Sequence, residues 1–206
     1  MDFDITSMKQ RAKALMRGTS PNPKLLGILF AVFYIVYEIC IFSTVESAYY
    51  VWIFLAVEVI YLNFRVSSTL YGLKVAREEA TSVSDAFLGF KKGAVKYFIL
   101  SVLKDICYVI GICFCGIGVL VPFYWFRFSA YIIKDEEANP FQALGRSVIL
   151  LRGHYRELIK LDITNIGWIA LQMFTGGISG FYVKPYLAIT YAEFYDYLKA
   201  QENLFS

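Results

Sequence analysis

The chain has 206 residues, of which 58% are hydrophobic, 18% aromatic and 18% charged, and its formal net charge is +3. Soluble domains are typically about 45–50% apolar and about 25% charged, so this chain has too little polar surface to cover a soluble core. The composition excludes an ordinary soluble domain. It predicts an all-α polytopic integral membrane bundle with room for about five or six spans of about 20 residues.

The composition also argues against metal, cofactor and nucleic-acid chemistry. Basic residues lie in patches between apolar stretches and form no single footprint for a nucleic acid. The four cysteines contain no C-x-x-C pair, and one histidine, His154, cannot complete a zinc ligand set with them. We therefore expect no cofactor, no metal and no nucleic-acid partner, and interpret the cysteines as apolar packing residues.

Residues 1–18 are predicted to form an amphipathic interfacial helix, which Asp4 or Thr6 can cap. Such a helix before a first span binds anionic lipid at the bilayer surface, although a plain basic flank that sets orientation explains the same residues. Its apolar positions are Ile5, Met8, Ala12, Leu15 and Met16, and its basic positions are Lys9, Arg11, Lys13 and Arg17.

Six apolar stretches follow, and each is predicted to be a membrane helix. Pro122 stands early in the fourth, where a missing N–H is tolerated. The last is the weakest crossing because it contains Glu193 and Asp196. The predicted membrane helices are residues 25–44, 49–71, 96–115, 118–133, 161–179 and 181–199.

The stretches 72–95 and 134–160 are predicted to be cytoplasmic loops that contain short helices. In the second, Asn139 as N-cap, Pro140 at the first helical position and Gly153 as the stop bound one helix. Its expected apolar face is Phe141, Leu144, Val148 and Leu151.

The basic residues predict the orientation. They gather before the first span, between the second and third, and between the fourth and fifth, whereas the alternate connections hold almost none except Lys184. By the positive-inside rule, both termini of this multi-pass protein lie in the cytoplasm.

Five ionisable residues inside spans one to four form a candidate intramembrane charged group. Each costs about 2.5–3.5 kcal/mol on insertion scales unless it has a partner or a purpose. Asp105 and Arg127 lie equally far from a turn near residue 116, which predicts an ion pair between them. Two roles are possible for this pair: it can clamp two helices together, or it can form part of a path for a substrate or a proton. The group is Glu38, Glu58, Lys104, Asp105 and Arg127.

Glu38 and Glu58 are expected at similar depths on either side of a turn near residue 48. Two such carboxylates can share a proton or take Lys104 as a counter-ion. The plainer alternative is that they face a wet crevice or bond neighbouring hydroxyl groups.

Other polar and small residues predict helix packing. Asp162 and Asn165 are expected at the cytoplasmic edge, where they pack helices or snorkel towards water. Gly176, Gly177 and Gly180 predict a close approach of two helices.

Enzymatic chemistry has little support in the sequence. Ser101 and Lys104 have the spacing of a serine–lysine dyad, but S-x-x-K arises often by chance. One histidine cannot supply an intramembrane metalloprotease site, and the chain has no Gly-rich phosphate loop. We therefore predict a protein without catalytic residues.

Several short stretches in the second half of the chain together resemble the sequence pattern of a known protein family. They are Pro122 with Ala130–Ile133, Ala143–Ser147 with Gly153–His154, Leu161–Asp162 with Gly167–Trp168, and then Thr175–Gly177, Tyr182–Tyr186 and Ala192–Tyr195. In these the chain resembles a bacterial membrane-protein family catalogued as domain-of-unknown-function family 975. That family has Pro-Gly at the bend of the fourth span, whereas here Phe123 follows Pro122. The resemblance implies the six-helix layout and a bacterial cell membrane, and it implies no activity.

The leading functional hypothesis is a small non-enzymatic membrane protein that acts through a lipid, peptide or protein partner. Envelope maintenance or self-protection against a membrane-active peptide fits its size, and assembly as a homo-oligomer is left open. The alternative is a small transporter or channel that uses the intramembrane charged group, and a membrane enzyme is third.

Overall fold

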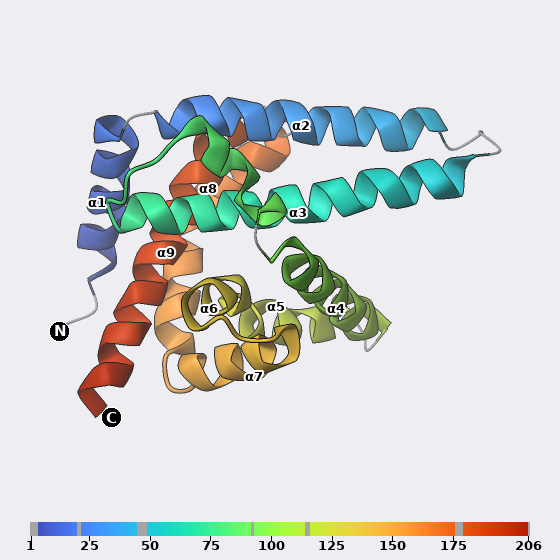
Figure 1. The fold of residues 1–206 in the computed structure, drawn as a ribbon. Coiled ribbons are helices and arrows are strands. Elements are labelled where there is room, and N and C mark those ends of the chain that lie inside the picture. Colours follow the sequence, from blue (N-terminus) through green and yellow to red (C-terminus); the bar gives the residue numbers. More distant parts are fainter. Residues whose placement is uncertain are drawn as a thin grey trace.

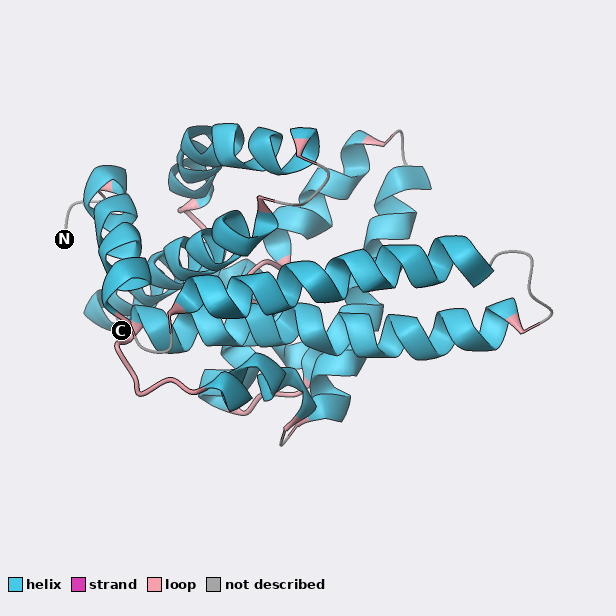
Figure 2. Ribbon diagram, turned by 90° about the horizontal axis from the view of Figure 1, so that it is seen from above, coloured by secondary structure: helices cyan, strands magenta, loops and turns pink. Residues whose placement is uncertain are grey.

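The fold is all-helical wherever the computed structural model describes the chain, which is at residues 4–19, 22–44, 49–91, 93–113, 116–175 and 179–205. Every regular element in these ranges is a helix, and the helices form one bundle (Figure 1, Figure 2). The predicted helical class is therefore confirmed for the described residues.

Helix α1, Ile5–Gly18, is amphipathic as predicted and packs against the bundle. Asp4 caps it by accepting hydrogen bonds of 2.9 and 3.3 Å from two amides of the first turn. Met16 on its apolar face is fully buried, whereas the basic Lys13 and Arg17 are exposed. Protein therefore covers the apolar face of α1 and leaves part of its basic face open.

Helices α2, Pro23–Thr44, and α3, Tyr50–Ala76, lie antiparallel and side by side (Figure 1, Figure 2). Their stretches Pro23–Cys40 and Trp52–Ala76 are long and apolar enough to cross a membrane, and no other described helix meets both criteria. Only 24% and 35% of these stretches is buried, unlike the core helix of a soluble domain. Exposed apolar side chains of α2 are Leu25, Ile28, Val32, Ile35, Val36 and Ile39.

The chain then turns back along α3 before it enters the next long helix. The 3-10 helix η1, Val83–Phe90, begins with a capping box between Ser82 and Asp85. The amide of Gly89 donates to the buried hydroxyl of Ser67 at 2.8 Å, which holds η1 against α3. Helix α4, Ala94–Cys113, follows.

The predicted fourth span, residues 118–133, is not one helix. The chain forms the 3-10 helix η2, Ile117–Val119, and then α5, Leu120–Trp125. A turn at residues 126–128 separates α5 from α6, Ser129–Glu136. The prediction of a continuous helix is therefore wrong.

A buried hydroxyl group from another helix stabilises this break. Ser147 lies in α7, Pro140–Leu151, and is fully buried. Its Oγ donates to the carbonyl of Trp125 at 2.7 Å and accepts from the amide of Phe128 at 3.3 Å. Ser147 thus provides partners for backbone groups on both sides of the turn.

Replacing Ser147 with Ala is expected to lower the free energy of unfolding by about 1–3 kcal/mol, because a buried amide and a carbonyl lose their partner. Chemical unfolding in detergent micelles measures this change. The control is Ser84→Ala at an exposed position of η1, where we expect a change within about 0.5 kcal/mol. Equal effects of the two substitutions would contradict the assigned role of Ser147.

Helix α7 begins as predicted, with Asn139 in a capping box and Pro140 in the first turn. Its predicted apolar face is only partly right. Leu144 and Leu151 are buried, but Phe141 is 69% exposed, because the buried face of α7 is rotated towards Ser147.

Helices α8, Tyr155–Phe174, and α9, Gly180–Phe205, complete the bundle. Helix α9 contacts α1, α2 and α3, and its residues Tyr186, Ile189 and Tyr195 are fully buried. The start of α1 and the end of α9 lie near one end of the molecule, far from the tips of α2 and α3 (Figure 1).

Two glycines allow α9 to approach the α2–α3 pair closely. A Cβ atom added to Gly72 would lie 2.6 Å from the backbone of Ala188, and one added to Gly27 would overlap the carbonyl of Phe181. No side chain fits at either crossing without a backbone shift. These are the contacts for which small residues serve in helix packing.

Gly27 and Gly72 are not the glycines for which the sequence predicts close packing, which are Gly176, Gly177 and Gly180. Gly176 and Gly177 are outside the described residues. A Cβ atom on Gly180 would meet its nearest neighbour at 3.5 Å, which is ordinary van der Waals contact. Close packing at Gly180 is therefore not found.

Candidate functional site

A cavity of about 460 Å³ lies where α2, α3, α4, α9 and the α5–α6 break converge. This volume is in the range of small-molecule sites. The described residues that line it include four cations and no carboxylate. The cations are Arg65, Lys104, Arg127 and Lys184, and the aromatic wall includes Tyr34, Tyr61, Phe64, Phe123, Tyr131 and Tyr191.

Arg127 stands at the helix break and pairs with Asp162 of α8, not with Asp105. Its Nη1 lies 3.1 Å from Asp162 Oδ2, and the Tyr191 hydroxyl donates to Asp162 Oδ1 at 2.6 Å. The guanidinium also lies over the Tyr191 ring, 3.9 Å from its centroid. The predicted Asp105–Arg127 pair is wrong because the turn at residues 126–128 ends the helical register on which equal depth depended.

Asp105 pairs instead with Arg65 of α3, at 3.2 Å between Oδ1 and Nη2. The two side chains are 37% and 41% exposed, compared with 14% and 16% for Asp162 and Arg127. The Arg65–Asp105 pair is thus the more solvated of the two, and only its cation lines the cavity.

Glu38 and Glu58 do not line the cavity. Glu58 accepts a hydrogen bond of 2.7 Å from the Tyr37 hydroxyl, and Glu38 is exposed. No ion pair joins Lys104 to either carboxylate within the described residues. The structure therefore does not bring together the predicted group as a whole.

Lys104 and Lys184 form no salt bridge with any described residue. The Lys184 ammonium lies 4.3 Å from the centroid of the Tyr34 ring. Since Arg65 and Arg127 are paired with carboxylates, Lys104 and Lys184 are the basic side chains of the described cavity wall that have no salt bridge.

The geometry gives no support to the serine–lysine dyad. Ser101 is 2% exposed and is not among the residues that line the cavity. No hydrogen bond links it to Lys104 in the described part of the chain. Asn165 also lies away from the cavity, fully buried, with its Oδ1 3.5 Å from the Tyr186 hydroxyl.

Sequence reasoning identified Lys104 and Arg127 but missed Arg65 and Lys184 as site residues. Both had a visible signal. Arg65 lies within the predicted span 49–71, and Lys184 is the basic exception among connections that otherwise contain almost none. The positive-inside rule explains such basic residues by membrane orientation alone, and so it gives no reason to assign them to a site.

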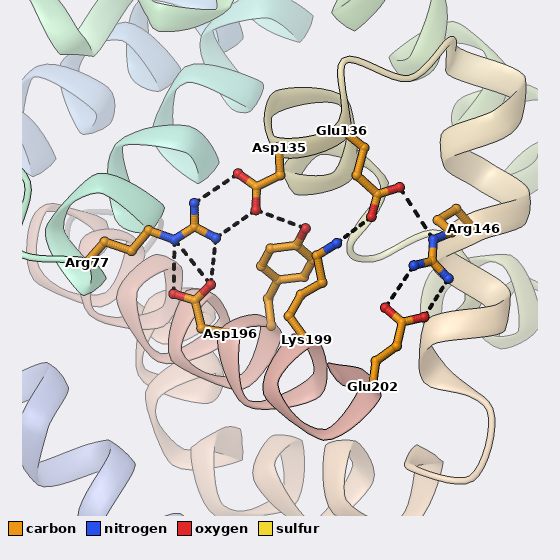
Figure 3. A network of polar contacts seen from close by, with 8 residues as sticks. Arg77, Asp135, Glu136, Arg146, Asp196, Lys199 and Glu202 are labelled. Atoms are coloured by element: carbon orange, nitrogen blue, oxygen red, sulfur yellow. Dashed lines mark hydrogen bonds and ion pairs between the residues drawn. The ribbon is translucent and has the colours of Figure 1, made fainter. Parts of the chain in front are cut away.

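An ion-pair cluster, not predicted from the sequence, joins the C-terminal ends of α3 and α6 to α7 and to the C-terminal half of α9 (Figure 3). Arg77, at the end of α3, bonds both Asp135 of α6 and Asp196 of α9, with shortest N–O distances of 2.6 Å. Tyr195 donates to Asp135 at 3.1 Å. Next to it, Glu136 pairs with Arg146 and Lys199, and Arg146 pairs with Glu202.

These contacts shift the pKa values of Arg77, Asp135 and Arg146. Hydrogen bonds that Arg77 donates to Asp135 and Asp196 raise the pKa of Arg77. Burial raises the pKa of Asp135, but the hydrogen bonds and charge of Arg77 outweigh it and hold the pKa below its usual value. Hydrogen bonding to Glu202 likewise raises the pKa of Arg146.

Comparison with known proteins gives one family. Residues 105–202 match the model of a family described as "Protein of unknown function (DUF975)". No curated protein and no solved structure matches the chain. The matched range contains Arg127, Asp162 and the members of the ion-pair cluster in α6, α7 and α9, but not α2 and α3.

Proposed function

We propose that this chain, whose residues 105–202 match the DUF975 family model, is a non-enzymatic membrane protein that binds an anionic lipid inside the bilayer. The observation that carries the proposal is the cationic cavity. Two lysines without carboxylate partners favour an anion, and the surrounding aromatic rings favour an apolar chain next to it.

The proposed topology has six crossings, by α2, α3, α4, the α5–α6 pair, α8 and α9, with both termini in the cytoplasm of a bacterium. Apolar side chains on α4 and α8 are exposed as they are on α2, which fits contact with lipid tails. They include Ile106, Val109, Ile110, Ile163, Ile166, Met173 and Phe174. Three charges of the proposed crossings follow the usual pattern of intramembrane charges: Asp105 and Arg127 have carboxylate or guanidinium partners, and Lys104 faces the cavity.

The helix break supports a binding role for this cavity. Non-helical backbone at membrane depth is tolerated where protein buries it or where it lines a cavity. Here Ser147 pairs the free backbone groups, and Arg127 in the turn reaches the cavity wall. The exposed basic residues Lys13 and Arg17 of α1 would meet anionic headgroups at the cytoplasmic surface.

The proposal predicts that purified protein retains anionic lipid in preference to zwitterionic lipid, and that Lys104→Gln weakens this binding about tenfold. A charge-assisted hydrogen bond contributes about 1.5–3 kcal/mol, and tenfold corresponds to about 1.4 kcal/mol. Binding of phosphatidylglycerol and phosphatidylcholine is compared by native mass spectrometry in detergent.

The control is Lys96→Gln, on the same helix but outside the cavity, where the ammonium donates to the carbonyl of Glu137. We expect this variant to bind as the parent does. Equal retention of both lipids by the parent, or equal losses in the two variants, would contradict the proposal. A retained peptide in place of lipid would favour the self-protection hypothesis.

A further inference from the structure

Three helices that line the cavity continue directly into the ion-pair cluster. In α3, Thr69 lines the cavity and Arg77 is in the cluster, about two turns further on. In α6 and α9, the cavity residues Tyr131 and Tyr191 are followed by Asp135 and Asp196. The cluster therefore lies beyond the cavity along these three helices, and it includes Glu202 close to the C-terminal end of α9 (Figure 3).

A layer of aromatic rings separates the cavity from the cluster. Tyr131 stacks on Tyr195 with ring centroids 5.0 Å apart, and Phe128 packs on both at 6.0 Å. All three are at most 2% exposed. The Tyr195 hydroxyl donates to Asp135, so a hydrogen bond joins the aromatic layer to the ion-pair cluster next to it.

We propose that this aromatic layer and the ion-pair cluster together form a gate that closes the cytoplasmic end of the cavity. When the gate opens, the anionic ligand can enter or leave the cavity from that side. The identity of the ligand and the cytoplasmic location of the gate rest on the proposed function and topology, whereas the closure itself rests on the packing of α3, α6 and α9.

The fold supplies a moving part for such a gate. Helix α6 has eight residues and is separated from α5 by the turn at residues 126–128, which ends next to the cavity. Ion pairs to Arg77, Arg146 and Lys199 hold its far end. Side chains of the Arg77 pairs are 16–34% exposed, so they keep partial contact with solvent and a high salt concentration weakens them in part.

Thiol labelling tests the gate without any ligand. In a variant whose four native cysteines are replaced by Ser, Ser68→Cys places a reporter thiol at the cavity wall. A membrane-impermeant maleimide is added to inside-out vesicles, which present the cytoplasmic face. We expect slow labelling of the parent reporter, about tenfold faster labelling with Arg77→Gln, and faster labelling in 1 M than in 50 mM KCl.

Two further variants make the test specific. Tyr195→Phe keeps the ring stack and removes only the hydrogen bond to Asp135, and we expect a smaller acceleration, about twofold to threefold. Arg11→Gln removes ion pairs to Glu78 and Glu193 that lie outside the gate, and it should label as slowly as the parent. If Arg77→Gln does not fold, the labelling rates of the parent at the two salt concentrations and of Tyr195→Phe still test the gate.

Three outcomes would each overturn the gate. They are rapid labelling of the parent at low salt, a labelling rate that changes neither with salt nor with Tyr195→Phe, and an acceleration by Arg11→Gln equal to that by Arg77→Gln. None of these outcomes affects lipid binding by the cavity, which is measured in detergent on the protein without the reporter. Conversely, loss of lipid preference leaves the labelling result unchanged, so the two proposals fail separately.

Discussion

Gly72→Ala is expected to destabilise the protein strongly although it adds a single methyl group. The new Cβ atom would lie 2.6 Å from both the backbone carbon and the Cβ of Ala188, and neither belongs to a flexible side chain. Helix α9 must therefore move away from α3. Overpacking typically costs about 1–3 kcal/mol, and backbone contact places this substitution at the upper end or above it.

Gly27→Ala is expected to have a comparable effect, because its Cβ atom would overlap the carbonyl of Phe181 at the crossing of α2 and α9. Unfolding in detergent micelles and the yield of monodisperse protein measure both substitutions. The matched control is Gly167→Ala in α8, where nothing lies within 4 Å of the added atom. Because Ala favours helix by about 0.5–1 kcal/mol over Gly, the control should be neutral or stabilising.

A small effect of both Gly72→Ala and Gly27→Ala, similar to that of Gly167→Ala, would show that α9 does not cross the α2–α3 pair in this register. A large effect of only one would place the close approach at that crossing alone. The two crossings are far enough apart on α9 that their effects should add.

Local signals predicted the helices and their caps well. Asp4 and Asn139 are recognised by residue type and by the periodic apolar residues that follow them, and both act within one turn of chain. The break between α5 and α6 had no such local signal. It depends on the hydroxyl of Ser147, which comes from a different helix and reaches the turn only after the bundle has packed.

The candidate site was predicted only in part for the same reason. Lys104 and Arg127 are conspicuous as charges within apolar stretches, and the structure places both at the cavity. Their partners depend on tertiary arrangement. Equal distance from a turn predicts equal depth only for two unbroken helices, so Asp105 was matched with the wrong arginine. The glycines show the same limit: their spacing in the sequence predicts close packing at Gly180, but the close approaches of α9 to α2 and α3 are at Gly27 and Gly72.

Arg127→Gln and Asp162→Asn are each expected to lower the free energy of unfolding by about 3–5 kcal/mol, because each leaves a mostly buried charge without its counter-ion. The double variant should lose less than the sum of the two, since two neutral amides need no counter-ion. Unfolding of all four proteins in the same detergent gives the interaction energy of the pair.

The matched pair for this cycle is Arg65→Gln with Asp105→Asn. Those side chains are 41% and 37% exposed, so water replaces a lost partner and each single substitution should cost about 1 kcal/mol or less. If the Arg127–Asp162 cycle gave no larger interaction energy than this pair, Asp162 would not be the counter-ion that holds Arg127 at the helix break. Arg127 would then join Lys104 and Lys184 as a basic side chain of the cavity wall without a salt bridge, and the preference for an anionic ligand should be correspondingly stronger.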